Sequence, residues 1–170
     1  MMLELLKSAP KARRAALLGE AIEALWMAST PTEIVRIIRG SAYTISNVDG
    51  VAFVLRDGDH CHYVDEDAIG PLWKGRKYPM FACISGHCML NKASIVIPDI
   101  YADGRIPHDL YRPTFVKSLM MVPVRVEDPL AAVGYYWAQK GYPGDETIAF
   151  LEALAGAATD AITACARASF

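Results

Sequence analysis

The hydrophobic pattern of this chain changes its period twice, and this change restricts the fold more than any other feature. Up to residue 46 and again after residue 144, apolar residues recur every three or four positions, as in amphipathic helices. Between these stretches the apolar runs are short and are separated by turn signals. Helices at both ends of a set of strands predict an α+β domain with a mostly antiparallel sheet. At 170 residues we expect one domain, with N-terminal helices over 1–46, the sheet and its connections over 51–139, and a C-terminal helix over 145–168.

Local signals place the boundaries of the N-terminal helices. Ser8 is placed to cap the first helix. Thr30 is placed to cap a second helix, with Pro31 at its first position and Glu33 completing a capping box. Asn47 follows the last apolar residue of this pattern and is expected to end the second helix.

The middle of the chain predicts about six strands joined by hairpins. Asp57-Gly58 is a strong hairpin signal between two short apolar runs, and Glu127-Asp128-Pro129 marks a second hairpin. A long irregular connection is expected over 65–79, a short helix over 85–92 and a polar, turn-rich segment over 101–117, while Asp145 can cap the C-terminal helix. The expected strands are residues 51–56, 60–64, 80–84, 94–100, 118–126 and 131–139.

Charge and cysteine spacing argue against several classes of function. Seventeen Lys and Arg against nineteen Asp and Glu give a net charge of −2, so no nucleic-acid partner is expected. The four cysteines are irregularly spaced and form no Cys-x-x-Cys pair, which argues against a disulfide framework and a structural zinc site and favours a reducing, cytoplasmic location. No apolar run approaches the length of a membrane span, so no membrane partner is expected.

One stretch has a family resemblance. Residues 84–123 read ISGHCMLNKASIVIPDIYADGRIPHDLYRPTFVKSLMMVPV. They resemble the second half of a GAF domain, in which a helix is followed by a strand ending in Asp, a polar segment with a short helix, and a strand of the Ser-apolar-apolar-apolar-Val-Pro kind. The corresponding pieces are Gly86–Lys92, Ile95–Asp99, Tyr101–Lys117 and Ser118–Pro123. The likeness is to GAF domains of bacterial sensor histidine kinases and, more distantly, to bilin-binding GAF domains of phytochrome-like photoreceptors.

The resemblance implies a profilin-like fold with a six-stranded antiparallel sheet. Helices would cover one face, and a lid formed by residues 65–79 and 85–117 would cover the other, with a small molecule bound between lid and sheet. It further implies a sensory domain that is not itself an enzyme, that forms a homodimer through its terminal helices, and that signals to a histidine kinase or another output. The expected ligand-binding residues are Trp73, Tyr78, His87, Cys88, Asp99, Tyr101, His108, Tyr111, Arg112 and Phe115.

Two further hypotheses depend on cysteine. Bilin-binding relatives carry a Cys-His pair where this chain has Pro107-His108, so the attachment thiol is absent and covalent bilin is not expected at this point, although Cys83 or Cys88 could substitute from a neighbouring element. Free methionine sulfoxide reductases of this fold need paired pocket cysteines, and Ser85 stands where that family has one. A thiol-dependent reductase using Cys83 and Cys88 therefore remains the catalytic alternative.

Several of these residues also have a structural interpretation. His60 and His62 would share one face of a strand and could hold a metal ion or haem together with His87 or Cys88, but a solvated hairpin explains them as well, and we expect no metal. Asp99 could bond the loop backbone instead of a ligand, and His108 could be a solvated loop residue. No cofactor is predicted with certainty.

Overall fold

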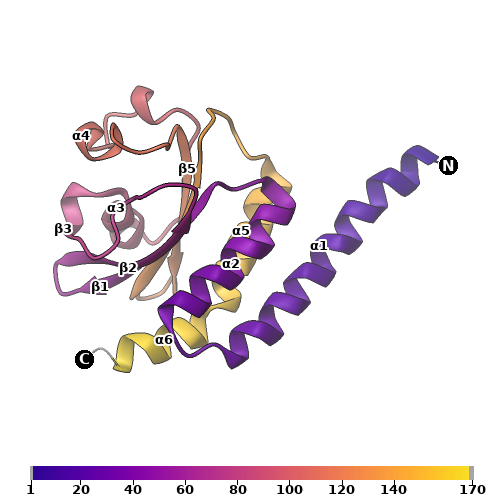
Figure 1. The fold of residues 1–170 in the computed structure, drawn as a ribbon, viewed down its shortest axis with the longest axis horizontal. Coiled ribbons are helices and arrows are strands. Elements are labelled where there is room, and N and C mark those ends of the chain that lie inside the picture. Colours follow the sequence, from indigo (N-terminus) through magenta and orange to yellow (C-terminus); the bar gives the residue numbers. More distant parts are fainter. Residues whose placement is uncertain (1, 169–170) are drawn as a thin grey trace.

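The computed structural model describes the backbone of residues 2–168 and the side chains of residues 11–168. Its centre is a six-stranded, fully antiparallel sheet with the strand order β3-β2-β1-β6-β5-β4. Helices cover one face of the sheet, and the short helices and loops of the lid cover the other (Figure 1). The predicted α+β class and six-stranded antiparallel sheet are confirmed. The strands are β1 (Gly50–Asp57), β2 (His60–Ala68), β3 (Lys77–Pro79), β4 (Ile95–Ile97), β5 (Ser118–Val124) and β6 (Ala131–Trp137).

The helical layer is formed by the two ends of the chain. It contains α1 (Met2–Met27), α2 (Pro31–Ser46), α5 (Asp145–Ala157) and α6 (Thr159–Ala168). The lid side carries the 3-10 helices η1 (Met80–Ala82) and η2 (Ile100–Ala102), and the α-helices α3 (Ile84–Asn91) and α4 (His108–Tyr111). In Figure 1, α2 and α5 lie against the sheet, and the N-terminal part of α1 projects away from it.

The strongest local signals are confirmed. The Thr30 hydroxyl accepts the backbone N–H of Glu33, and the Glu33 carboxylate accepts the backbone N–H of Thr30, so the capping box of α2 is complete. Asn47 ends the same helix with a left-handed backbone, at φ 52°. Asp57 pairs with His60 across a tight turn in which Gly58 has φ 62°, a conformation that glycine adopts without strain.

Three boundary predictions before residue 85 are wrong. The first helix begins at Met2 and runs through Pro10, so Ser8 is inside it and is not its cap. The connection predicted over 65–79 is shorter, because β2 continues to Ala68 and β3 begins at Lys77. Residues 80–84 are not a strand: they form η1 and the start of α3, since a short apolar run has no period that separates a buried strand from a buried helical turn.

The C-terminal helix is two helices. The helix is interrupted at Ala158, and α6 is bent by 44° relative to α5. Asp145 is the first residue of α5 and accepts the Tyr142 hydroxyl at 2.7 Å, whereas Gly144 holds the cap position. Within residues 2–168 no single helix is long and apolar enough to cross a membrane; α5 and α6 meet that criterion only when they are taken together across their bend.

The sheet separates two hydrophobic cores, because successive side chains of a strand point to opposite faces. On β6, Val133 and Tyr135 face the helices, whereas Ala132 and Tyr136 face the lid. The helix-side core includes Leu25, Ile34, Ile38, Phe53, Met120, Leu151, Leu154 and Ile162, and the lid-side core includes Cys61, Tyr63, Trp73, Ile84, Met89, Ile97, Tyr111, Met121 and Tyr136.

Candidate functional site

The middle of the lid loop, residues 69–76, is anchored by one carboxylate, while backbone hydrogen bonds to Asp49 and Tyr63 hold its two ends. Glu66, near the end of β2, accepts the backbone N–H groups of Leu72, Trp73 and Lys74 at 2.8, 2.9 and 2.8 Å. Hydrogen bonds to an ionised acceptor are stronger than neutral ones, so this arrangement fixes the backbone of the loop. Glu66 therefore helps to position the backbone from which the Trp73 side chain enters the interior.

Trp73 joins the lid loop to the rest of the lid and to the sheet. Its indole N–H donates to the carbonyl oxygen of Leu110 at 3.0 Å, which connects the lid loop to α4. Its ring centroid lies 4.6 Å from that of Tyr111 and 5.6 Å from those of Tyr63 and Tyr136. Tyr78 on β3 adds a further edge contact, 5.7 Å from Tyr63. We call these five residues the aromatic cluster, and their rings occupy the space between the lid and the sheet.

The hydroxyl groups of the aromatic cluster are unequally satisfied. The Tyr63 hydroxyl lies 3.0 Å from the Ser85 hydroxyl and is hydrogen-bonded to it. The hydroxyls of Tyr78 and Tyr136 are buried and have no hydrogen-bond partner in the structure. Burial raises the pKa of Tyr136 well above its usual value, so its hydroxyl remains protonated. An unpaired buried hydroxyl costs about 1–3 kcal/mol, so the lid-side core carries two groups that a bound molecule could satisfy.

Gly134 makes room for the Tyr136 ring. The two residues lie on the same face of β6, and a Cβ built on Gly134 would sit 2.3 Å from the Tyr136 hydroxyl oxygen. The tyrosine ring therefore folds back over the glycine, parallel to the strand, instead of standing away from the sheet. The absence of a side chain at position 134 is what allows this orientation.

The structure brings together some of the predicted ligand-binding residues. Trp73, Tyr78 and Tyr111 belong to the aromatic cluster. Phe115 is half-buried at its border, where its ring lies against the positions of Gly50 and Gly70.

Four other predicted residues lie in or next to the polar segment 101–117 and contact other groups of the protein. Asp99 accepts the backbone N–H of Tyr101 at 3.1 Å and forms an ion pair with Lys140 at 3.4 Å. Tyr101 is exposed, and the Lys117 ammonium lies 5.2 Å from its ring centroid. The His108 Nε2 atom lies 3.0 Å from the Ile100 carbonyl oxygen and 3.2 Å from that of Asp103. Arg112 is exposed and pairs with Asp109. These contacts brace the lid, which agrees with the structural interpretation of Asp99.

His87 and Cys88 lie on α3. His87 is half-buried, and the Cys88 thiol donates to the Met121 carbonyl oxygen at 3.5 Å. Burial raises the pKa of Cys88 to about 12, so its thiol is protonated and is a poor nucleophile. Among the residues that the structure describes, no three His, Cys, Asp or Glu side chains gather where they could hold a metal ion. His60 instead pairs with Asp59, at 2.8 Å.

Sequence reasoning missed Tyr63, Glu66 and Tyr136. Tyr63 and Tyr136 lie on predicted strands, and the alternation along each strand places them on the lid side, so their face was predictable. The role of Glu66 was hidden because residues 65–68 were assigned to an irregular connection, although they extend β2.

The sequence and the fold were then compared with known proteins. A family model described as a GAF domain matches residues 28–163. A search of curated proteins found no significant match.

Solved structures share the fold at low sequence identity. The free methionine-R-sulfoxide reductase of Neisseria meningitidis in complex with its substrate has a TM-score of 0.73 at 16% identity, over 92% of each chain. The chromophore-binding domain of a bacteriophytochrome from R. palustris has a TM-score of 0.73 at 16% identity, over 94% of this chain and 63% of its own. The GAF domain of a two-component sensor histidine kinase from Bacillus halodurans has a TM-score of 0.68 at 15% identity, over 80% of this chain and 95% of its own.

Proposed function

Because the chain belongs to the GAF domain family, whose members are generally sensory or regulatory, we propose that it binds a small molecule non-covalently between the sheet and the lid. The observation that carries this proposal is the pair of buried, unpartnered hydroxyls of Tyr78 and Tyr136. A ligand that supplies hydrogen-bond partners to both groups would recover the free energy that their burial costs. The domain would act by binding and not by catalysis.

The surroundings of these hydroxyls favour a neutral, planar ligand. The aromatic rings offer edges and faces against which a planar molecule can pack. The Glu66 carboxylate contributes to the raised pKa of Tyr136, so its negative charge acts at this position and would repel an anion. Since the rings already occupy the interior, binding requires the lid loop to move and to take Trp73 with it.

Two consecutive residues of β6 provide a route from the ligand to the terminal helices. Tyr136 faces the lid, whereas the Tyr135 hydroxyl donates to the Leu151 carbonyl oxygen of α5 at 2.9 Å on the opposite face. Helix α5 in turn contacts α1, to which it is joined by the Arg14–Glu146 ion pair at 2.9 Å. Suppose that β6 and these helices have two arrangements and that the ligand binds one of them more tightly. The ligand would then shift the equilibrium toward that arrangement, by a free energy equal to its difference in affinity for the two.

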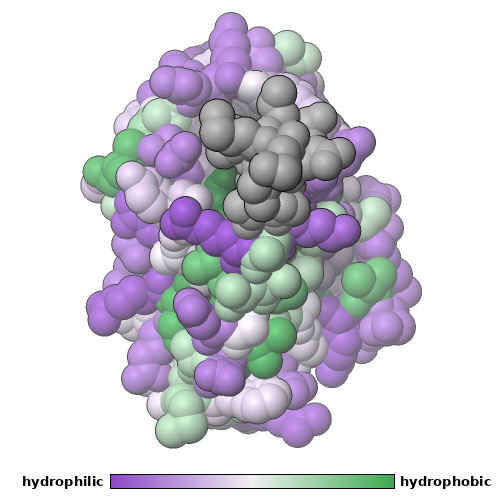
Figure 2. All heavy atoms as spheres, turned by 90° about the vertical axis from the view of Figure 1, so that its right-hand side faces the viewer, coloured by the Kyte–Doolittle hydropathy of each residue, from purple (hydrophilic) through white to green (hydrophobic). Residues whose placement is uncertain are grey.

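We further propose that the signal leaves through a homodimer formed by the terminal helices in a cytoplasmic protein. The last two residues of α1, Trp26 and Met27, are 72% and 85% exposed, which is unusual for large apolar side chains. On the side of the molecule that α1 covers, hydrophobic side chains gather among hydrophilic ones (Figure 2). The structural likeness to a histidine kinase GAF domain supports a kinase as one candidate output partner.

Native mass spectrometry and a thermal-shift screen test the proposal together. The purified protein is first weighed under native conditions for a retained small molecule and for its number of subunits. Neutral planar compounds with two hydrogen-bonding groups are then screened against the wild type and Tyr136→Phe. We expect at least one compound to raise the unfolding temperature of the wild type and to have a smaller effect on the variant. If no compound is retained and none stabilises the wild type, the proposal is wrong.

A further inference from the structure

Asp65 is a buried carboxylate that two parts of the molecule share. It lies on β2 opposite Phe53, on the helix side of the sheet, and is 4% exposed. Its Oδ2 atom accepts the hydroxyl of Thr32, in the first turn of α2, at 2.5 Å. Its Oδ1 atom lies 3.0 Å from the ammonium of Lys74, in the lid loop, and accepts the Glu66 backbone N–H at 2.8 Å. One carboxylate therefore contacts both the helical layer and the lid.

The lid loop reaches Asp65 around the edge of β2. The strand β3 pairs with the first three residues of β2, and the backbone of the lid loop follows the edge from there. Successive side chains of β2 point to opposite faces, so Asp65 and Glu66 hold the same lysine from two sides. Glu66 accepts the Lys74 backbone N–H at 2.8 Å on the lid side, and Asp65 pairs with its ammonium on the helix side. The Lys74 side chain thus crosses from one face of the sheet to the other.

The burial of Asp65 depends on these partners, because a buried charge is costly unless it is paired and hydrogen-bonded. Burial raises the pKa of Asp65, but hydrogen bonds from Thr32 and Lys74 lower it below its usual value, so the carboxylate is ionised at neutral pH. If the lid loop leaves the edge of β2, the Lys74 ammonium leaves with it. Water that then solvates the carboxylate competes with the Thr32 hydroxyl for the Oδ2 atom.

We propose that the Lys74–Asp65–Thr32 contact is a latch that couples the position of the lid loop to the first turn of α2. While the latch is closed, each partner holds the carboxylate where the other contacts it, and release of the lid loop loosens this turn. Helix α2 packs against α1, α5 and α6, so the change reaches the helical layer by a path separate from the one through β6. Further along α2, Arg39 pairs with Asp67 at 2.6 Å, so the middle of the helix stays anchored.

Hydrogen exchange on the complete, ligand-free chain tests the latch, so the result does not depend on whether a small molecule binds under the lid. Lys74→Met removes the ammonium but keeps the backbone N–H that Glu66 accepts. We expect the amides of Glu33 and Ile34, in the first turn of α2, to exchange about threefold faster than in the wild type, while exchange beyond Arg39 is unchanged. If Lys74→Met accelerates exchange only within the lid loop, the proposal is overturned.

The reciprocal variant removes the other partner of the carboxylate. Thr32→Val deletes the hydroxyl at nearly constant volume, and because coupling between two sites is reciprocal, exchange at the Trp73 amide should accelerate by a similar factor. Unchanged exchange at Trp73 would contradict the coupling. In an Asp65→Asn background the shared charge is gone, so Lys74→Met should have no further effect on α2, and an undiminished effect would overturn the assigned role of Asp65. The comparison of Lys74→Met with the wild type is decisive alone if Asp65→Asn folds poorly.

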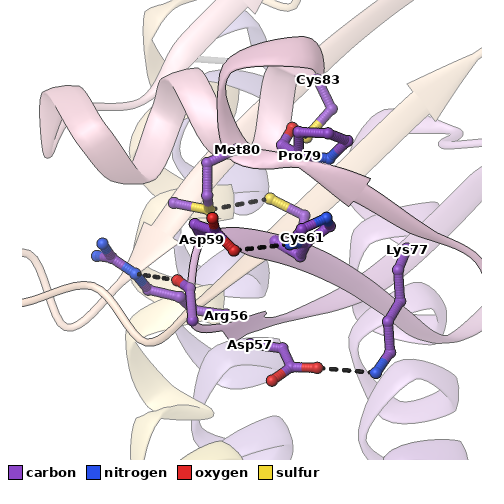
Figure 3. A network of polar contacts seen from close by, with 10 residues as sticks. Arg56, Asp57, Asp59, Cys61, Lys77, Pro79, Met80 and Cys83 are labelled. Atoms are coloured by element: carbon purple, nitrogen blue, oxygen red, sulfur yellow. Dashed lines mark hydrogen bonds and ion pairs between the residues drawn. The ribbon is translucent and has the colours of Figure 1, made fainter.

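Lys77 provides a matched control. Its ammonium pairs with Asp57 at 2.8 Å beside the tight turn between β1 and β2 (Figure 3), and neither residue belongs to the helical layer. Lys77→Met removes a lysine ion pair near the same edge of the sheet without altering the contact of Asp65 with Thr32. Exchange in the first turn of α2 should therefore stay at the wild-type rate. An acceleration as large as that in Lys74→Met would indicate a general loss of stability and would overturn the latch.

Discussion

Removing the Tyr136 hydroxyl should make the ligand-free protein more stable. In most buried positions Tyr→Phe is destabilising, because the hydroxyl loses a hydrogen bond worth about 0.5–1.5 kcal/mol. The Tyr136 hydroxyl has no such bond to lose, and its burial without a partner costs about 1–3 kcal/mol. Taking the lower end of that range, Tyr136→Phe should raise the free energy of unfolding by about 1 kcal/mol and the melting temperature by about 2–4 °C.

The neighbouring residue provides a matched control. Tyr135 is equally buried on the same strand, but its hydroxyl donates to the Leu151 carbonyl oxygen at 2.9 Å. Tyr135→Phe removes the same atom together with this hydrogen bond, so it should lower the free energy of unfolding by about 1 kcal/mol. Tyr63→Phe, which loses the bond to Ser85, should behave like Tyr135→Phe. The predicted effects of two adjacent residues thus have opposite signs.

Urea denaturation followed by tryptophan fluorescence measures these differences. The dependence of the unfolding free energy on urea should be the same in all four proteins, so that the midpoints report stability alone. If Tyr136→Phe lowers the midpoint as much as Tyr135→Phe does, the hydroxyl has a partner in solution, and the argument for a ligand based on it is refuted.

Three further predictions concern the lid loop, β2 and α3. Glu66→Ala removes the shared acceptor of three lid-loop N–H groups, so hydrogen exchange at Trp73 should accelerate about tenfold or more, and unchanged exchange would contradict the assigned role. Burial alone would raise the pKa of Asp65, but hydrogen bonds from Thr32, Lys74 and the Glu66 N–H lower it below its usual 3.8. The ionised carboxylate therefore stabilises the fold at neutral pH. This contribution to the free energy of unfolding is lost as the pH falls below about 4. Denaturation measured from pH 3 to 7 should show a smaller acid-induced loss in Asp65→Asn than in the wild type, and identical profiles would refute it. Gly86→Ala would place a Cβ 1.7 Å from the Met80 carbonyl oxygen and should lower the free energy of unfolding by about 3 kcal/mol. The control is Gly40→Ala in α2, where nothing lies within 4 Å of the new Cβ, and it should raise the free energy of unfolding by up to about 1 kcal/mol. Equal melting temperatures of the two variants would show that the close approach at Gly86 is absent.

The parts of the fold that could be predicted are those with local signals. The capping box at Thr30 and the tight turn at Gly58 are determined by residues within a few positions of each other, and both are present. Residues 80–84 have no such signal, because Met80, Cys83 and Ile84 are buried by packing against distant segments. The bend at Ala158 likewise lies in a run of small residues that contains no proline, and Gly156 within this run is too weak a signal to place a bend.

The candidate site was less predictable than the fold. Trp73, Tyr78 and Tyr111 were identified from the sequence as possible lining residues. The hydrogen bond between the Trp73 indole and Leu110, however, joins positions 37 apart, and neither residue spacing nor hydrophobic periodicity predicts it. The polar residues of the 101–117 segment were natural candidates for ligand contacts, yet His108 contacts the carbonyl oxygens of Ile100 and Asp103 and Arg112 pairs with Asp109, all in or next to the same segment. Polar residue types indicate where hydrogen bonds form, whereas only the folded chain shows with which partner.

The missing side chain at position 134 sets the depth of the lid-side interior. An alanine at this strand position would meet the hydroxyl end of the neighbouring tyrosine and would tip its ring toward the lid. Substituting larger residues at Gly134 would therefore change the volume beneath the lid by moving the Tyr136 ring, without changing the identity of any residue that the proposed ligand contacts.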